Sequence, residues 1–163
     1  MLEAWRQSCR QRRRRWQLRS GQANETENTG RAKRAMSGYL QNFDLTHGIN
    51  ILRLICGLFF IPHIYAKFFV PEALGFFVAA KFRPPAGWMY TACVIETSLA
   101  IGLIFAIAPV VAGALGFVHL VVAGGAVWKV TKGKWLWNIG GYEYCLFWAI
   151  CCLVVAMYYA GLG

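Results

Sequence analysis

Six ionisable side chains lie inside or at the ends of long apolar stretches of this sequence. They are Arg53, His63, Lys67, Glu96, His119 and Glu143. A charge placed in hydrocarbon costs roughly 2.5–3.5 kcal/mol on insertion scales, so each of these groups needs a partner, water or a functional role. A carboxylate and histidines that are partly withdrawn from water can exchange protons near neutral pH. The pattern therefore indicates a polar cluster inside a membrane protein.

The elements that must position these residues are four apolar stretches, each long enough to cross a bilayer. They cover about residues 49–69, 88–108, 110–128 and 142–160. Pro109 separates the second from the third, because an unbroken helix over 88–128 would be about 60 Å long, twice the hydrocarbon core. With 58% hydrophobic residues, residues 41–163 are predicted to form an all-α, four-transmembrane-helix bundle. Pro62 predicts a kink in the first span, and a short helix is expected through residues 72–80.

Residues 1–40 form a different kind of segment, which is basic and lacks apolar periodicity. They contain ten of the 17 Lys and Arg residues but only three acids. This composition predicts a disordered tail. The tail is interpreted either as a cytoplasmic anchor on anionic lipid headgroups or as sequence upstream of a natural start at Met36. Nucleic-acid binding is disfavoured, because no folded aromatic platform accompanies the arginines.

The charges give conflicting signals about orientation. The basic tail favours a cytoplasmic N-terminus, whereas the loop cations Lys81, Arg83, Lys129, Lys132 and Lys134 would then lie on the far side, against the positive-inside rule. Four spans place both termini on the same side of the membrane. The prediction adopted is that both termini are cytoplasmic.

Depth along the predicted helices brings most of the polar residues to one level. His63 and Lys67 are four residues apart and share a helix face. Glu96 lies roughly 12 Å below the same membrane surface, and His119 is at a similar depth. Arg53 is deeper, but its long side chain can extend towards Glu96, and Glu143 opens the fourth span. These residues are therefore expected to line one vestibule at one membrane face.

A quinone headgroup is one ligand that this chemistry suits, because it needs hydrogen-bond donors, a proton route and an apolar channel. His63, Lys67 and Glu96 would serve the first two needs, and Phe59, Phe60 and Trp88 the third. The structural alternatives are an Arg53–Glu96 pair that fastens two helices, a snorkelling Lys67 and a simply packed His119. Axial haem ligation by His63 and His119 is disfavoured by a depth difference of roughly 10 Å. The six cysteines show no metal-binding spacing, so no metal site is predicted.

Three local patterns resemble the DoxX family of four-helix membrane proteins. The first is Leu52-Arg53-Leu54 followed by Phe59-Phe60-Ile61-Pro62-His63 and Lys67. The second is Val94-Ile95-Glu96 followed by Leu99-Ala100-Ile101-Gly102-Leu103, and the third is Gly140-Gly141-Tyr142-Glu143-Tyr144. The resemblance covers about residues 45–163 and omits the tail.

The resemblance implies a bacterial inner-membrane protein. The family is named for a subunit of a thiosulfate:quinone oxidoreductase, and other members are similar to partners of redox and oxidative-stress proteins. Residue by residue, it assigns Arg53, His63, Lys67, Glu96 and Glu143 to the polar positions of the family; His119 comes from the depth argument alone. Because most members have no established activity, the resemblance leaves open whether the chain is an enzyme.

Three functional hypotheses follow. The first is a quinone-associated subunit of a membrane oxidoreductase system. The second is a non-catalytic scaffold for a redox or stress-response complex, which would use the aromatic loop 70–87 and Trp135 and Trp137 as docking surfaces. The third is a proton-coupled carrier of small solutes, for which four helices are few unless the chain dimerises. Whether the chain forms a homo-oligomer is left open.

Overall fold

The computed structural model describes residues 25, 27–134 and 141–162. These residues are helices and their connections, as expected for an all-α protein. The chain divides into two compact units, residues 1–44 and 45–163. The second unit contains the apolar helices and all the residues of the predicted polar cluster.

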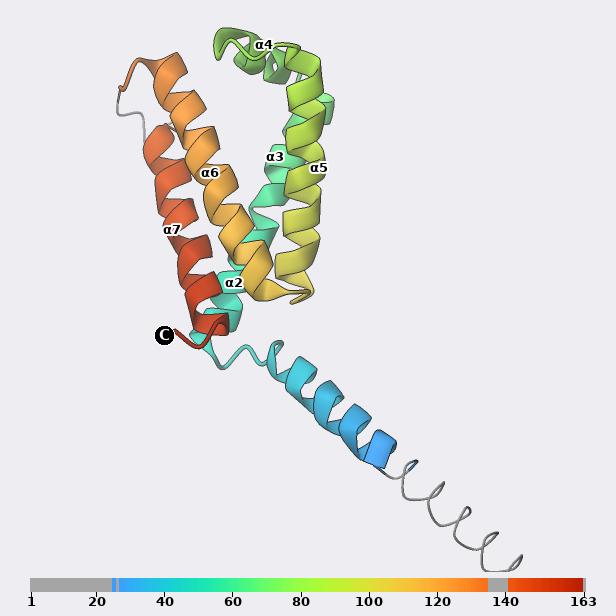
Figure 1. Ribbon diagram of the computed structural model, residues 1–163. Helices are drawn as coiled ribbons and strands as arrows, with labels where there is room; N and C mark the ends of the chain where they lie inside the picture. Colours follow the sequence, from blue (N-terminus) through green and yellow to red (C-terminus); the bar gives the residue numbers. More distant parts are fainter. Residues whose placement is uncertain (1–24, 26, 135–140, 163) are drawn as a thin grey trace, which may run out of the picture. The chain divides into compact units, whose positions relative to one another are not determined.

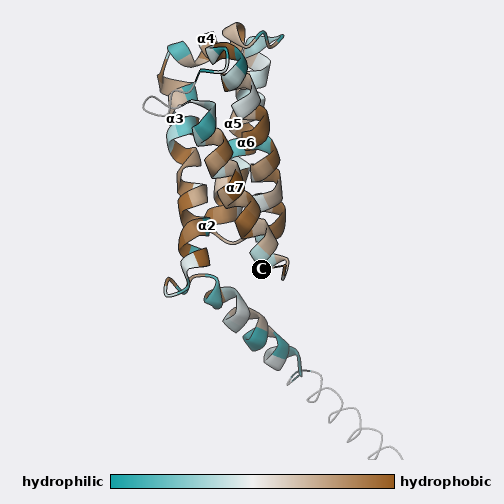
Figure 2. Ribbon diagram, turned by 90° about the vertical axis from the view of Figure 1, so that its left-hand side faces the viewer, coloured by the Kyte–Doolittle hydropathy of each residue, from teal (hydrophilic) through white to brown (hydrophobic). Residues whose placement is uncertain are grey.

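Four helical segments are long and apolar enough to cross a membrane. The first is α2 (Gly48–Leu58) continued by α3 (Phe60–Phe69), and the others are α5 (Pro85–Ile104), α6 (Pro109–Thr131) and α7 (Tyr142–Tyr159). They contain 22, 20, 23 and 18 residues, and at 1.5 Å per residue each matches a hydrocarbon core of about 30 Å. Figure 2 shows hydrophobic residues along all four segments. The protein is therefore a multi-pass integral membrane protein, and the predicted four-span bundle is confirmed.

The helix boundaries depart from the predicted ones at two prolines. Pro85 occupies the first turn of α5, where a missing N–H costs nothing, so the helix begins before Trp88. The same helix ends at Ile104 rather than near residue 108, because the backbone turns tightly through Ala106 and Ala108, both at positive φ. Pro109 then starts α6, which continues to Thr131.

The first span is interrupted where Pro62 predicts a kink. Helix α2 ends at Leu58 and α3 begins at Phe60. Pro62 has no N–H to donate to the carbonyl of Leu58, and its ring crowds that carbonyl. The expected short helix after the first span is also present, as α4 (Glu72–Ala79), and it lies at the end of the bundle where α3 ends and α5 begins (Figure 1).

Small residues decide which helices approach closely. A Cβ atom added at Gly113 of α6 would lie 2.8 Å from the Cys152 carbonyl oxygen of α7, and one at Gly124 would lie 3.2 Å from the Cys145 Cβ. Helices α6 and α7 accordingly run side by side along their lengths (Figure 1). Since lipid gives apolar helices no hydrophobic reason to associate, such close contacts carry much of the packing energy.

Helices α5 and α6 approach closely only near their connecting turn. There, a Cβ atom at Gly102 would lie 2.9 Å from the Ala112 Cβ. Further from the turn, α6 carries Leu115, Val118 and Val122, and the two helices diverge (Figure 1). The divergence leaves space between them inside the bundle.

In the first unit, residues 27–41 are helical, which differs from the disorder that the composition of the tail predicts. The segment contains good helix formers, and Glu27 and Arg31 form an ion pair one helical turn apart. Residues 1–24, including the arginine run, lie outside the described residues, as do Trp135 and Trp137 of the last loop.

The close packing of α6 on α7 yields a first prediction. Gly113→Ala should lower the free energy of unfolding by about 1–3 kcal/mol, because the new methyl group meets backbone of α7. In detergent this should appear as a midpoint of thermal unfolding lower by roughly 3–10 °C. Gly125→Ala in the same helix is the matched control, since a Cβ there meets nothing within 4 Å. Equal midpoints for the two variants would contradict the packing argument.

Candidate functional site

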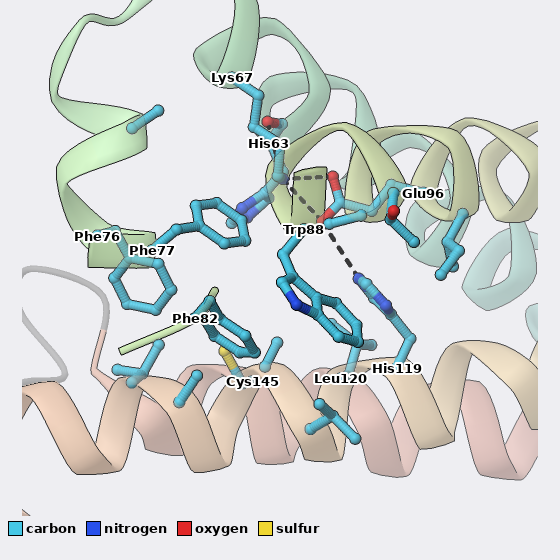
Figure 3. A pocket seen from close by; sticks show the side chains of 18 of the residues that line it. His63, Lys67, Phe76, Phe77, Phe82, Trp88, Glu96, His119, Leu120 and Cys145 are labelled. Carbon is cyan, nitrogen blue, oxygen red and sulfur yellow. Dashed lines mark hydrogen bonds and ion pairs between the residues drawn. The ribbon is translucent and has the colours of Figure 1, made fainter. Parts of the chain in front are cut away.

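Three ionisable side chains from three different spans meet in the interior of the bundle. The Lys67 ammonium of α3 donates to both carboxylate oxygens of Glu96 in α5, at 2.8 and 2.6 Å. His119 Nε2 of α6 lies 3.2 Å from Glu96 Oε1. The three side chains are only 12%, 9% and 15% exposed, respectively. Lys67, Glu96 and His119 are called the ion cluster below, and Figure 3 shows their side chains converging.

The helices position this cluster so that each charge is compensated. Lys67 lies in the last turn of α3, where the negative end of the helix dipole favours a cation, and its ammonium also lies 3.3 Å from the His63 carbonyl oxygen. Glu96 lies near the middle of α5, the depth at which an unpartnered carboxylate would be most costly. Two donors from neighbouring helices make burial of the carboxylate tolerable. The cluster thus links α3, α5 and α6.

The ion cluster borders a pocket with a volume of about 800 Å³, within the range of about 300–1,000 Å³ common for small-molecule sites. Helices α3 to α7 and the loop residue Phe82 all contribute to its lining. Apart from the ion cluster and His63, most of the lining is aliphatic or aromatic. Its aromatic side chains are Phe76, Phe77, Phe82, Trp88 and Trp148. The pocket is therefore amphipathic, as an apolar ligand with a polar head would require.

His63 is the histidine of the pocket that stands apart from the ion cluster. Its ring stacks near Tyr144, with centroids 6.3 Å apart and planes at 19°, and lies 5.4 Å from the Trp148 ring. Trp148 is itself fixed, because its Nε1 donates to the Cys56 carbonyl at 3.2 Å. The side chain of His63 makes no hydrogen bond with any described residue.

Arg53 lies elsewhere and does not form the pair with Glu96 that was one of the structural alternatives. It is fully buried and donates to the Leu103 carbonyl, to the Ile104 carbonyl at 3.0 Å and to the Tyr159 hydroxyl at 3.1 Å. The last carbonyls of a helix lack intrahelical donors and carry the negative end of its dipole. The end of α5 therefore compensates the guanidinium, and Glu96 takes its partners from Lys67 and His119 instead.

The Arg53 network includes two residues that the sequence analysis did not single out. The Tyr159 hydroxyl donates to Asn50 Oδ1 at 2.6 Å, so the network joins α2, α5 and α7. The spacing of Asn50 and Arg53 was an available signal, since residues three apart share a helix face. Nothing in the local sequence marks Tyr159 as their partner.

Glu143 also falls outside the pocket lining. It occupies the first turn of α7 and is partly buried. A carboxylate at this position is favoured by the positive end of the helix dipole, which accounts for its place in the sequence without a role at the pocket.

Of the three aromatic residues that were predicted to line an apolar channel, one lines the pocket. Trp88 lines the pocket, whereas Phe59 and Phe60 do not. Phe60 is buried against Trp148, with ring centroids 4.3 Å apart. The remaining aromatic lining comes from α4, its following loop and α7, which depth reasoning along single helices does not bring together.

Comparison with known proteins identifies one related family. The DoxX family model matches residues 48–129, just over half of the chain. The match includes the helices that carry the ion cluster, His63 and Arg53 and excludes α7. No curated protein and no solved structure matches the sequence.

The Arg53 network yields a second prediction. Arg53→Met should lower the free energy of unfolding by about 3 kcal/mol, because the carbonyls of Leu103 and Ile104 lose a buried charged donor. Thermal unfolding in detergent should show a midpoint lower by roughly 6–12 °C. Arg83→Met, at an exposed position, makes the same chemical change and should leave the midpoint unaltered. A tolerated Arg53→Met would show that the network contributes little.

The ion cluster yields a third prediction, from a double-mutant cycle. Lys67→Met should destabilise the protein by about 3–5 kcal/mol, because it leaves the Glu96 carboxylate buried without its main partner. The double variant Lys67→Met with Glu96→Gln should be more stable than Lys67→Met alone, since both charges are then removed. Thermal unfolding of all four proteins measures the cycle, with Lys134→Met as an exposed control. A double variant destabilised by the sum of the single effects would argue against coupling.

Proposed function

This chain belongs to the DoxX family, and from that premise we propose that its membrane domain binds a quinone headgroup as a subunit of a membrane oxidoreductase system. One observation carries the proposal. An otherwise apolar pocket of about 800 Å³ borders a buried cluster of a lysine, a carboxylate and a histidine. A ligand that fits must offer hydrogen-bonding atoms at one end and a large apolar surface elsewhere.

The chemistry of quinone reduction suits these groups. Conversion of a quinone to a quinol adds electrons and protons, and the protons end on the carbonyl oxygens that began as hydrogen-bond acceptors. His63 would donate to one such oxygen, because its ring nitrogens make no hydrogen bond with the described residues. The ion cluster would supply the second proton and be refilled from the membrane surface. Electrons would come from a partner oxidoreductase subunit.

The aromatic side chains of the loop favour ligand binding over the scaffold alternative. A docking surface would need these rings to face outward, but Phe76, Phe77 and Phe82 line the pocket (Figure 3). Phe77 and Phe82 also lie against each other, with ring centroids 5.8 Å apart, and Phe82 lies 5.6 Å from Trp88. This chain of rings supports a role as a pocket wall.

The proposed location is the bacterial inner membrane, with both termini on the cytoplasmic side. Helix α2 begins and α7 ends at the same end of the bundle (Figure 1), as four crossings require. The pocket and α4 would then lie towards the opposite, periplasmic face, where an exported redox partner could be served.

The fourth prediction tests the function directly. The full chain purified in mild detergent should contain extractable quinone, and Glu96→Gln or His63→Ala should lower the bound amount about tenfold, or about 1.4 kcal/mol of binding free energy. Both variants should also slow quinol-linked electron flow in membranes. Glu143→Gln and His47→Ala make the same changes outside the pocket and should retain wild-type quinone.

The outcomes separate the two hypotheses. No quinone in the extract, together with unaltered electron flow in the two pocket variants, would reject the quinone proposal. A redox partner recovered stoichiometrically by affinity purification, and lost on substitution of loop 70–87 but not of Glu96, would establish the scaffold alternative instead.

A further inference from the structure

The pocket has an opening in its side, between α5 and α6. Several of its lining residues are also strongly exposed, so they form the rim of the opening rather than its interior. The rim residues of α6 are Leu115, Val118 and Val122, which are 56%, 55% and 60% exposed; those of α5 include Trp88 and Ile95, at 49% and 39%. The opening therefore faces whatever surrounds the bundle at this level.

The opening lies at the depth of the lipid tails. Leu115 is about 9 Å and Val122 about 20 Å along α6 from its first residue, at 1.5 Å per residue. Ile95 lies next to Glu96 near the middle of α5. Since the hydrocarbon core is about 30 Å thick, we expect Leu115, Val118, Val122 and Ile95 to face acyl chains rather than water.

The chemistry of the rim fits that environment. The exposed lining side chains of α5 and α6 are apolar except for Thr91, whose hydroxyl donates to the Gly87 carbonyl at 2.9 Å within the same helix. A water-soluble ligand would have to cross hydrocarbon to reach this opening. A molecule already dissolved in the membrane would meet no polar barrier before His63 and the ion cluster.

The pocket is also longer than one ring. Its lining on α6 extends from Leu115 to Thr131, a rise of about 24 Å. A single quinone ring occupies only a small part of that length, so the remaining apolar wall must be filled by lipid or by another part of the ligand.

We propose that the occupant enters the pocket sideways from the bilayer, between α5 and α6, and is a ring-headed lipid whose long apolar tail remains against Leu115, Val118 and Val122. This inference rests on the proposed function for the identity of the ring as a quinone. Beyond quinone binding, the inference specifies the route of access, the requirement for an apolar tail and the face of α6 that binds this tail. The ring lies towards His63 and the ion cluster, and the tail lies in the opening.

Photoaffinity labelling tests the route. The full chain is placed in nanodiscs of phosphatidylethanolamine and phosphatidylglycerol, with a benzoquinone that carries a diazirine at the end of a ten-carbon tail. Illumination should give saturable labelling of the rim of α5 and α6, located by mass spectrometry of peptides. An excess of the same tailed quinone without diazirine should reduce labelling at least fivefold, whereas the tail-free quinone at equal concentration should not.

Rim substitutions supply the matched controls. Val118→Trp and Val122→Trp, which narrow the opening, should each reduce saturable labelling about fivefold. Val111→Trp lies on the same face of α6, outside the pocket lining and 56% exposed, and should have less than a twofold effect. Thermal unfolding of each variant identifies any that fail to fold. If both rim variants fail to fold, the labelling pattern of the wild-type protein decides whether access is sideways.

The outcomes distinguish the route from the function. Saturable labelling confined to α4 or to residues 80–84 would overturn sideways access while quinone binding stands, and so would equal competition by the tail-free quinone. Cross-linking of two chains through the rim, without labelling by the probe, would show that a second copy covers the opening. No saturable labelling anywhere would reject quinone binding itself.

Discussion

A carboxylate held in the middle of a membrane is the constraint on which the rest of this structure depends. Glu96 lies near the centre of α5, and its charge is tolerable only because Lys67 and His119 reach it from two other helices. Those two contacts set the relative heights of α3, α5 and α6, because a shift of one turn would separate the groups. The polar cluster thus acts both as a fastener between spans and as the polar side of a pocket.

The pocket exists because the two ends of the bundle are held differently. Near the turn between α5 and α6, Gly102 permits close approach and Arg53 binds the final carbonyls of α5. Further along, the glycines of α6 keep it packed closely against α7. Helix α6 therefore diverges from α5. The ion cluster bridges the widening gap at one level, and the aromatic residues of α4 and its loop line the pocket beyond it. Close packing on one side of α6 therefore produces the cavity on its other side.

The sequence was sufficient for the spans and for part of the site. Long apolar runs, together with Pro62 and Pro109, predict the helices to within a few residues, and equal depth brings Glu96 and His119 together. The alternative in which Arg53 pairs with Glu96 is wrong, because depth along an ideal helix ignores the carbonyls at a helix end, which compete for a buried cation. A vestibule lined by polar residues was expected, but the apolar walls of the pocket could not be predicted, since they depend on the divergence of two helices and on rings from α4 that fold inward. The spacing of residues within one helix reveals neither the divergence of two helices nor the position of rings from another helix.

The charged groups of the ion cluster already bind one another, and this affects how a ligand can be recognised. Lys67 directs its ammonium to Glu96 and to the His63 carbonyl, so a ligand that took over this donor would have to break strong contacts in a region of low dielectric. His63 requires no such exchange, because its ring contacts the rings of Tyr144 and Trp148 and makes no hydrogen bond with any described residue. Direct hydrogen bonds to the ligand are therefore expected mainly at His63, while the ion cluster contributes to affinity through its proton and its field. A neutral head with hydrogen-bonding oxygens and a long apolar tail meets these conditions better than an ion, which would unbalance the charges that hold the three helices together.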